Sequence, residues 1–140
     1  MKLAWAEYLS VGNDLIDGDH KKLIVAVNNV AQAIEARDRA ALSKAYKLLN
    51  VLMSLHFINE EKIAKAVNIH FEENNLHHLQ LMDEIKYMIL KLDNLQSFWS
   101  DNVVKMYSRF LSDWIIEHIV EDDMKMKPVL ENYPYDMIPG

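Results

Sequence analysis

Apolar residues recur every three or four positions along most of the chain, the spacing that gathers them on one face of an α-helix. Between residues 19 and 127 there is no glycine or proline, and the apolar–polar alternation of a β-strand is missing. The pattern predicts helices over residues 19–37, 39–66, 70–91 and 100–125. Because the links are short, we expect an all-α fold, an antiparallel up-down-up-down four-helix bundle.

Two segments flank the predicted bundle. Residues 1–18 carry scattered large apolar residues without a clear period, which indicates an ordered N-terminal arm. All three prolines lie in residues 128–140, so this C-terminal tail should be extended and lie over one end of the bundle. We therefore divide the chain into an arm (1–18), a helical domain (19–127) and a tail (128–140).

Composition narrows the possible functions. The 140 residues, 51% of them hydrophobic, are enough for one domain with a real core. A net charge of −6 with scattered lysines and arginines argues against a nucleic-acid partner. No apolar run approaches the roughly 20 residues that span a bilayer, and the first residues do not resemble a signal peptide. We expect a cytoplasmic protein without a membrane partner.

Polar residues interrupt the apolar stripes where the helices should face the core. His56 and Glu60 continue the stripe of the second helix, and His78 and His118 continue those of the third and fourth. His20 lies one turn before the apolar face of the first helix. An unpartnered polar group costs roughly 2–7 kcal/mol when buried, and a charge costs more. A shared metal ion would satisfy all five, and the absence of cysteine requires nitrogen and oxygen ligands.

The fourth helix offers two carboxylates for such a site. Regular helical spacing from His118 favours Asp122, which is four residues further on. Asp123 follows immediately, so the pattern alone leaves both open.

Four motifs occur in a fixed order along the chain: IDGDHKKL at 16–23, HFxxEE at 56–61, Phe71 followed by His78 and Leu81, and LxxWIxxHI at 111–119 followed by Asp123. Together they resemble the motifs of bacterial hemerythrins over nearly the whole chain, to about residue 125. The resemblance implies a four-helix bundle that binds O₂ at two non-haem iron ions, for storage, delivery or sensing. The resemblance does not indicate which protein, if any, is a partner.

The resemblance also implies a role for each candidate residue. One iron takes two histidines, the other takes histidines of the third and fourth helices, and two carboxylates bridge the ions beside an oxo or hydroxo group. The implied ligands are His20 and His56 for one iron, His78 and His118 for the other, and Glu60 and Asp123 as the bridges. Trp114 and Ile115 would line the O₂ pocket, although apolar residues at helical spacing are usually ordinary core.

The choice of Asp123 over Asp122 has a structural consequence. Asp123 is five residues after His118, and five residues turn a regular helix by about 140°. The fourth helix must therefore bulge just after His118. Asp122 is then expected to be solvated.

Asn74 departs from the family pattern, because it stands where the third helix should carry another histidine ligand. An asparagine carbonyl is a poor ligand for a transition-metal ion, so water or a shifted His77 could take that position. On an ideal helix His77 belongs to the polar face, and we expect it to be exposed. A more open centre favours reactivity, and the alternative function is a di-iron oxidoreductase acting on peroxide, nitric oxide or ferrous iron.

Overall fold

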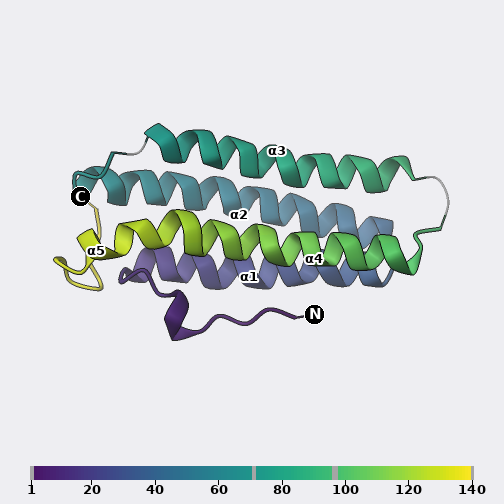
Figure 1. Ribbon diagram of the computed structural model, residues 1–140, viewed down its shortest axis with the longest axis horizontal. Helices are drawn as coiled ribbons and strands as arrows, with labels where there is room; N and C mark the ends of the chain where they lie inside the picture. The colour runs from purple at the N-terminus through teal and green to yellow at the C-terminus, as the bar shows by residue number, and fades with distance from the viewer. Residues whose placement is uncertain (1, 71, 96–97, 140) are drawn as a thin grey trace.

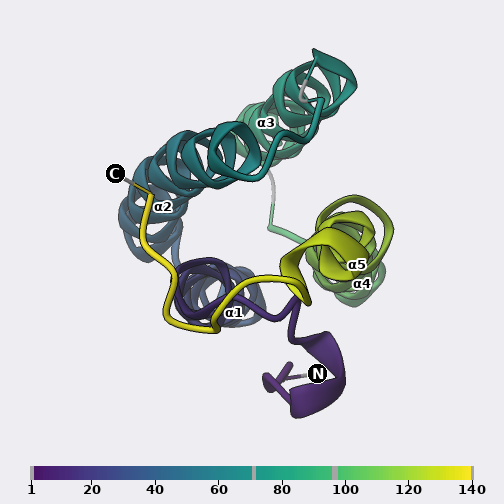
Figure 2. The ribbon, with the colours of Figure 1, turned by 90° about the vertical axis from the view of Figure 1, so that its left-hand side faces the viewer.

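The computed structural model describes residues 2–70, 72–95 and 98–139, except for the side chains of residues 72–75. It is all-helical over this part of the chain, and the predicted bundle is confirmed (Figure 1). Seen from one end, the long helices surround a common interior (Figure 2). The long helices are α1 (Asp14–Glu35), α2 (Arg39–Ala66), α3 (Glu72–Asn94) and α4 (Asp101–Glu117).

Shorter elements lie before and after the bundle. The arm contains one 3₁₀ turn, and α4 continues directly into a π-helical turn, a second 3₁₀ turn and the short helix α5. These elements are Glu7–Leu9, His118–Asp122, Asp123–Met126 and Lys127–Leu130, respectively. The tail prediction was therefore wrong for its first residues, because Pro128 lies in the first turn of α5, where a missing backbone N–H costs little.

Helix α1 begins at Asp14, five residues earlier than predicted. The prediction treated Asp17 and Gly18 as a turn, but the side-chain oxygen of Asn13 accepts a hydrogen bond from the backbone N–H of Ile16 at 3.1 Å. Such a cap stabilises a helix start by about 1 kcal/mol, which offsets the similar cost of a glycine inside the helix. The boundaries of α2 agree with the prediction, and Asp38 caps that helix through the N–H of Ala41.

The predicted apolar faces form the main core. Each long helix contributes side chains that are at most 7% exposed, and these include Leu23, Val27 and Ile34 of α1, Leu42 and Leu49 of α2, Ile85 and Ile89 of α3, and Leu111 and Ile115 of α4. None of the described helices is long and apolar enough to cross a bilayer.

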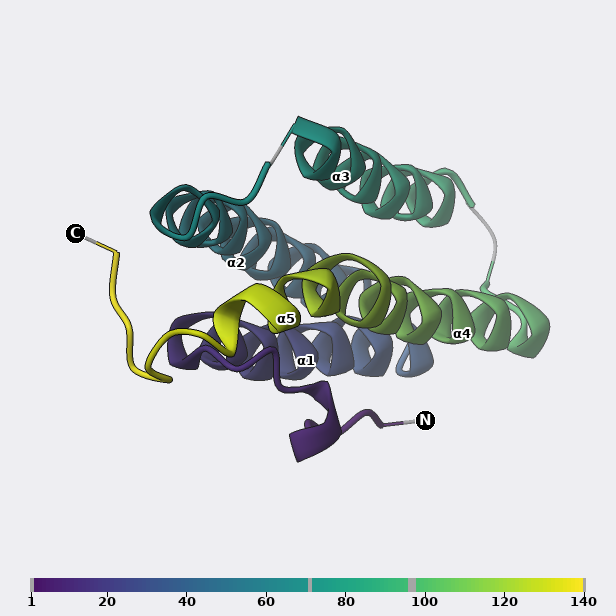
Figure 3. The same ribbon diagram turned by 60° about the vertical axis from the view of Figure 1, so that its left-hand side comes forward.

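The arm and the tail meet at the start of α1. The carboxylate of Asp17 accepts hydrogen bonds from Ser10 Oγ at 2.5 Å, from the backbone N–H of Val11 at 2.9 Å and from the Tyr135 hydroxyl at 2.9 Å. The tail runs from α5 across this end of the bundle (Figure 3). One buried carboxylate thus joins both chain ends to the helical domain.

Candidate metal centre

The structure brings all six predicted ligands together inside the bundle. Every one of them is at most 4% exposed. They come from α1, α2, α3 and the segment that follows α4. They are His20 of α1, His56 and Glu60 of α2, His78 of α3, His118 at the start of the π-helical turn, and Asp123 just after that turn.

The π-helical turn decides which aspartate faces the centre. Its extra residue turns Asp123 back toward the interior, so the bulge predicted after His118 is confirmed. Asp123 Oδ2 lies 3.1 Å from His118 Nε2. The expectation that Asp122 is solvated was wrong, because the wide turn also buries Asp122 and places its Oδ2 atom 3.4 Å from His118 Nδ1.

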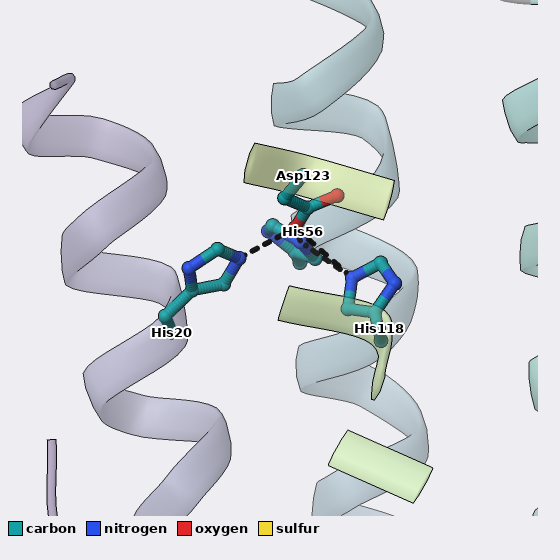
Figure 4. Close-up of side chains that lie close together, drawn as sticks. All are labelled: His20, His56, His118 and Asp123. Atoms are coloured by element: carbon teal, nitrogen blue, oxygen red, sulfur yellow. Dashed lines mark hydrogen bonds and ion pairs between the residues drawn. The ribbon is translucent and has the colours of Figure 1, made fainter. Parts of the chain in front are cut away.

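The carboxylate of Asp123 is the meeting point of three imidazole rings (Figure 4). Its Oδ2 atom lies 2.5 Å from His20 Nε2 and 3.0 Å from His56 Nε2, in addition to the contact with His118. The Nε2 atoms of His56 and His118 are themselves only 3.2 Å apart. Nitrogen atoms that converge in this way on one carboxylate oxygen are arranged as metal ligands are.

Glu60 provides a second buried carboxylate. Its Oε2 atom is 3.4 Å from His56 Nε2 and 3.2 Å from His78 Nε2, and neither of its oxygens accepts a well-formed hydrogen bond. Among the described residues, no lysine or arginine pairs with Glu60 or Asp123. Buried carboxylates need a positive partner, and a metal ion supplies it.

The ligand atoms form two overlapping sets, each with atoms within 4.8 Å of one another: His20, His56, His118 and Asp123, and Glu60, His78, His118 and Asp123. A ring nitrogen binds a single ion, whereas the two oxygens of a carboxylate can bind two. The donor set therefore fits a pair of ions that share Asp123 and are held by nitrogen and oxygen atoms only.

His118 and His56 are electrostatically favoured as cations. Burial by itself would lower the pKa of His118, but Asp123 and Asp122 outweigh it and raise this pKa to about 9. For His56, burial is likewise outweighed by hydrogen bonds with Asp123 and Asp19, so its pKa is raised. The aspartates therefore stabilise positive charge at the place that metal ions would occupy.

The pKa values of the other groups of the centre shift in different directions: those of His78, His20 and Asp123 fall and that of Glu60 rises. Burial and the charge of His118 lower the pKa of His78 to about 3, and burial lowers the pKa of His20. Burial and the neighbouring charge of Asp123 hold the pKa of Glu60 well above its usual range. Burial opposes ionisation of Asp123 as well, but His118 overcomes it and keeps that pKa well below its usual range. The neutral imidazoles of His20 and His78 and the ionised carboxylate of Asp123 are therefore in the protonation states that bind a metal ion.

A family model for the hemerythrin HHE cation-binding domain matches residues 11–130. The chain belongs to the hemerythrin family. The bacteriohemerythrin of Pseudomonas aeruginosa is 24% identical over 123 residues, which cover 86% of this chain and 76% of that protein. A hemerythrin-like protein of Naegleria gruberi is 29% identical over 126 residues, 90% of this chain and 92% of that protein.

A solved structure of a leucine-to-phenylalanine mutant has the same fold. It superposes with a TM-score of 0.75 at 20% identity, over 93% of this chain and 98% of the other. The hemerythrin family membership and the buried histidine–carboxylate cluster thus agree on a metal-binding bundle.

The structure says less about the roles of the other predicted residues of this hemerythrin-family chain. Trp114 and Ile115 are buried in the main core one turn before His118, and Trp114 Nε1 donates a hydrogen bond to the Leu81 carbonyl at 3.0 Å. Their contact with O₂ stays a prediction. The side chain of Asn74 lies outside the described residues.

His77 lies outside both ligand sets. Its side chain is 50% exposed, as expected for the polar face of α3, but its Nδ1 atom is 2.9 Å from Asp122 Oδ1.

Two contacts of the centre were not foreseen from the sequence. Asp19 Oδ2 lies 3.0 Å from His56 Nδ1 and accepts a hydrogen bond from Asn59 at 3.1 Å. The contact with Asp19 orients the His56 ring so that its Nε2 atom points inward. Phe57 stacks on the ring of His78 with the centroids 3.7 Å apart. Asp19 and Phe57 both stand beside a predicted ligand in the sequence, which was the available signal.

Proposed function

We propose that this protein binds O₂ reversibly at a non-haem di-iron centre. The observation that carries the proposal is the pair of ligand sets that meet at the carboxylate of Asp123. We further expect the protein to act in the cytoplasm in O₂ storage, delivery or sensing, without nucleic acid or membrane as a partner.

The proposed roles follow from the positions of the side chains. His20 and His56 would hold one iron and His78 and His118 the other, with Glu60 and Asp123 between them and a solvent-derived oxo or hydroxo group completing the bridge. Reduced iron would supply the redox chemistry of O₂ binding.

The chain itself supplies orientation and exclusion of water. Asp19 orients His56, and Phe57 fixes the ring plane of His78. Buried Trp114 and Ile115 would keep the neighbourhood of the centre dry, which limits further oxidation of the iron.

Optical spectroscopy of iron-loaded protein tests the proposal. Reduced protein exposed to O₂ should develop charge-transfer bands that disappear when O₂ is removed. Glu60→Gln should abolish the bands because it removes a bridging charge, while Glu61→Gln should keep them because Glu61 pairs instead with Lys65 on the helix surface, at 3.3 Å. Iron-loaded wild-type protein that shows no reversible bands would contradict the proposal.

Asn74 favours a second candidate, a di-iron oxidoreductase acting on peroxide, nitric oxide or ferrous iron. A missing histidine ligand would leave one ion more open and more reactive. If this candidate is right, the O₂ adduct of the wild type should be short-lived and Asn74→His should lengthen its lifetime in stopped-flow measurements. An unchanged or shorter lifetime would count against it.

A further inference from the structure

His118 has an aspartate at each of its ring nitrogens. Asp123 lies 3.1 Å from Nε2, on the side of the metal centre, and Asp122 lies 3.4 Å from Nδ1, on the other side. Neighbouring residues on a regular helix point about 100° apart, so the π-helical turn is what lets two consecutive aspartates face one ring.

Asp122 is held in turn by a residue of another helix. Its second oxygen, Oδ1, lies 2.9 Å from Nδ1 of His77 on α3. The three side chains form a continuous series from the half-exposed His77, through the buried Asp122, to the fully buried His118. His77, Asp122 and His118 also lie side by side in the wall of one surface hollow of about 180 Å³.

We propose that His77, acting through Asp122, is a positioning residue for His118 as a metal ligand. An acceptor at Nδ1 fixes the ring orientation and keeps the hydrogen on Nδ1, which leaves the lone pair of Nε2 for the ion. His118 needs this support because it begins an irregular turn, and His77 ties that turn to α3. The inference rests on the proposed function only in requiring that the centre binds metal.

The competing explanation is that the pair merely holds α3 against the π-helical turn. In that case the loss of His77 would lower the stability of the metal-free protein without changing how the centre holds an ion. Metal affinity and the spectrum of the bound ion therefore distinguish the two explanations.

Cobalt(II) is a suitable probe because its visible d–d bands report ligand geometry. We expect chelator competition to give about 10-fold weaker cobalt binding for His77→Ala and for Asp122→Asn, within the roughly 10–100-fold range of such outer contacts. The d–d bands should shift in both variants. Because the residues act in series, the double variant should be no weaker than Asp122→Asn alone.

Two further variants serve as controls. His77→Asn should restore near wild-type affinity, because its amide nitrogen can take the place of Nδ1, and His70→Ala should behave as wild type because His70 is exposed. Wild-type affinity and bands in His77→Ala, or multiplying losses in the double variant, would overturn the inference while the metal centre stands. A wild-type protein that takes up no cobalt would overturn the metal centre and this inference together. Cobalt uptake without reversible O₂ binding in the iron-loaded protein would overturn the proposed function alone.

Discussion

Single residues in the centre have opposite electrostatic tendencies although they lie a few ångströms apart. The pKa of His118 is raised to about 9 by two aspartates that outweigh its burial, while burial and the charge of His118 lower the pKa of His78 to about 3. The metal-free centre is therefore a partly protonated cluster, and metal binding must displace protons from it.

The metal-free protein should become less stable as the pH rises from about 6.5 to about 9. His118 has a higher pKa folded than unfolded, so its contribution is complete below about 6.5 and is lost as the pH passes 9. The shift corresponds to roughly 3 kcal/mol as an upper limit. Urea unfolding across this range should show a steeper fall in wild type than in His118→Gln, in which the raised pKa values of His56 and Glu60 still contribute a smaller loss. Parallel pH profiles of the two proteins would contradict it.

The sequence was informative for residues whose polarity conflicts with their position. His56, Glu60 and His78 could be predicted because they occupy apolar stripes. Asp122 was placed wrongly because helical spacing permits only one of two consecutive aspartates to face inward. The contact between Asp19 and His56 could not be predicted, because it joins residues 37 positions apart through the packing of α1 on α2.

At the level of elements, the π-helical turn is the feature on which the site depends most. It follows α4 without a break and places Asp123, five residues after His118, on the same side as that histidine. Periodicity alone would have favoured a regular helix, and only the resemblance to hemerythrin motifs required the bulge. The start of α1 was missed for a simpler reason: the cap at Asn13 offsets the cost of Gly18 inside the helix.

Deleting Val120 tests the role of this turn. Without the extra residue a regular helix can form, and Asp123 would then stand only four residues after His118, on the Nδ1 side that Asp122 occupies now. We expect helical content by circular dichroism to be largely kept and cobalt affinity to fall at least about 10-fold. Val120→Ala, which trims a half-exposed side chain and keeps the turn, should bind as wild type. A deletion variant with wild-type affinity would show that the π-helical turn is dispensable.

On the scale of the whole molecule, the chain ends close one end of the bundle near the centre. Asp17 is three residues before His20 and receives hydrogen bonds from the arm and from Tyr135 of the tail. Burial and the carboxylate of Asp17 raise the pKa of Tyr135 to about 12, so its hydroxyl stays a donor at neutral pH.

Tyr135→Phe should lower the free energy of unfolding by about 1 kcal/mol at pH 7. The loss is smaller than the roughly 1.5–3 kcal/mol of a hydrogen bond to a charged group because Tyr135 is 47% exposed. Tyr133→Phe, at a neighbouring half-exposed tyrosine, is the matched control and should change little. Equal effects of the two substitutions in urea unfolding would mean that the bond to Asp17 contributes nothing.

The bundle as a whole could be predicted from the sequence because a long stretch without glycine or proline, with apolar residues at helical spacing, has few other ways to fold. The meeting of the ligands was also predictable, since inward positions of antiparallel helices converge on one interior. The position of the tail over one end of the bundle was expected as well, but the contacts that attach arm and tail were not, because they are polar contacts between distant, non-periodic segments.

The proposed metal centre would hold a pair of ions through Asp123, the buried carboxylate that both ligand sets share. Its most direct test is an anaerobic titration of the metal-free protein with iron(II), read out as bound iron per chain. We predict saturation at about two ions per chain in the wild type and a clear loss in Asp123→Asn, because Asp123 belongs to both sets. Saturation at one ion, or the absence of binding, would contradict the account.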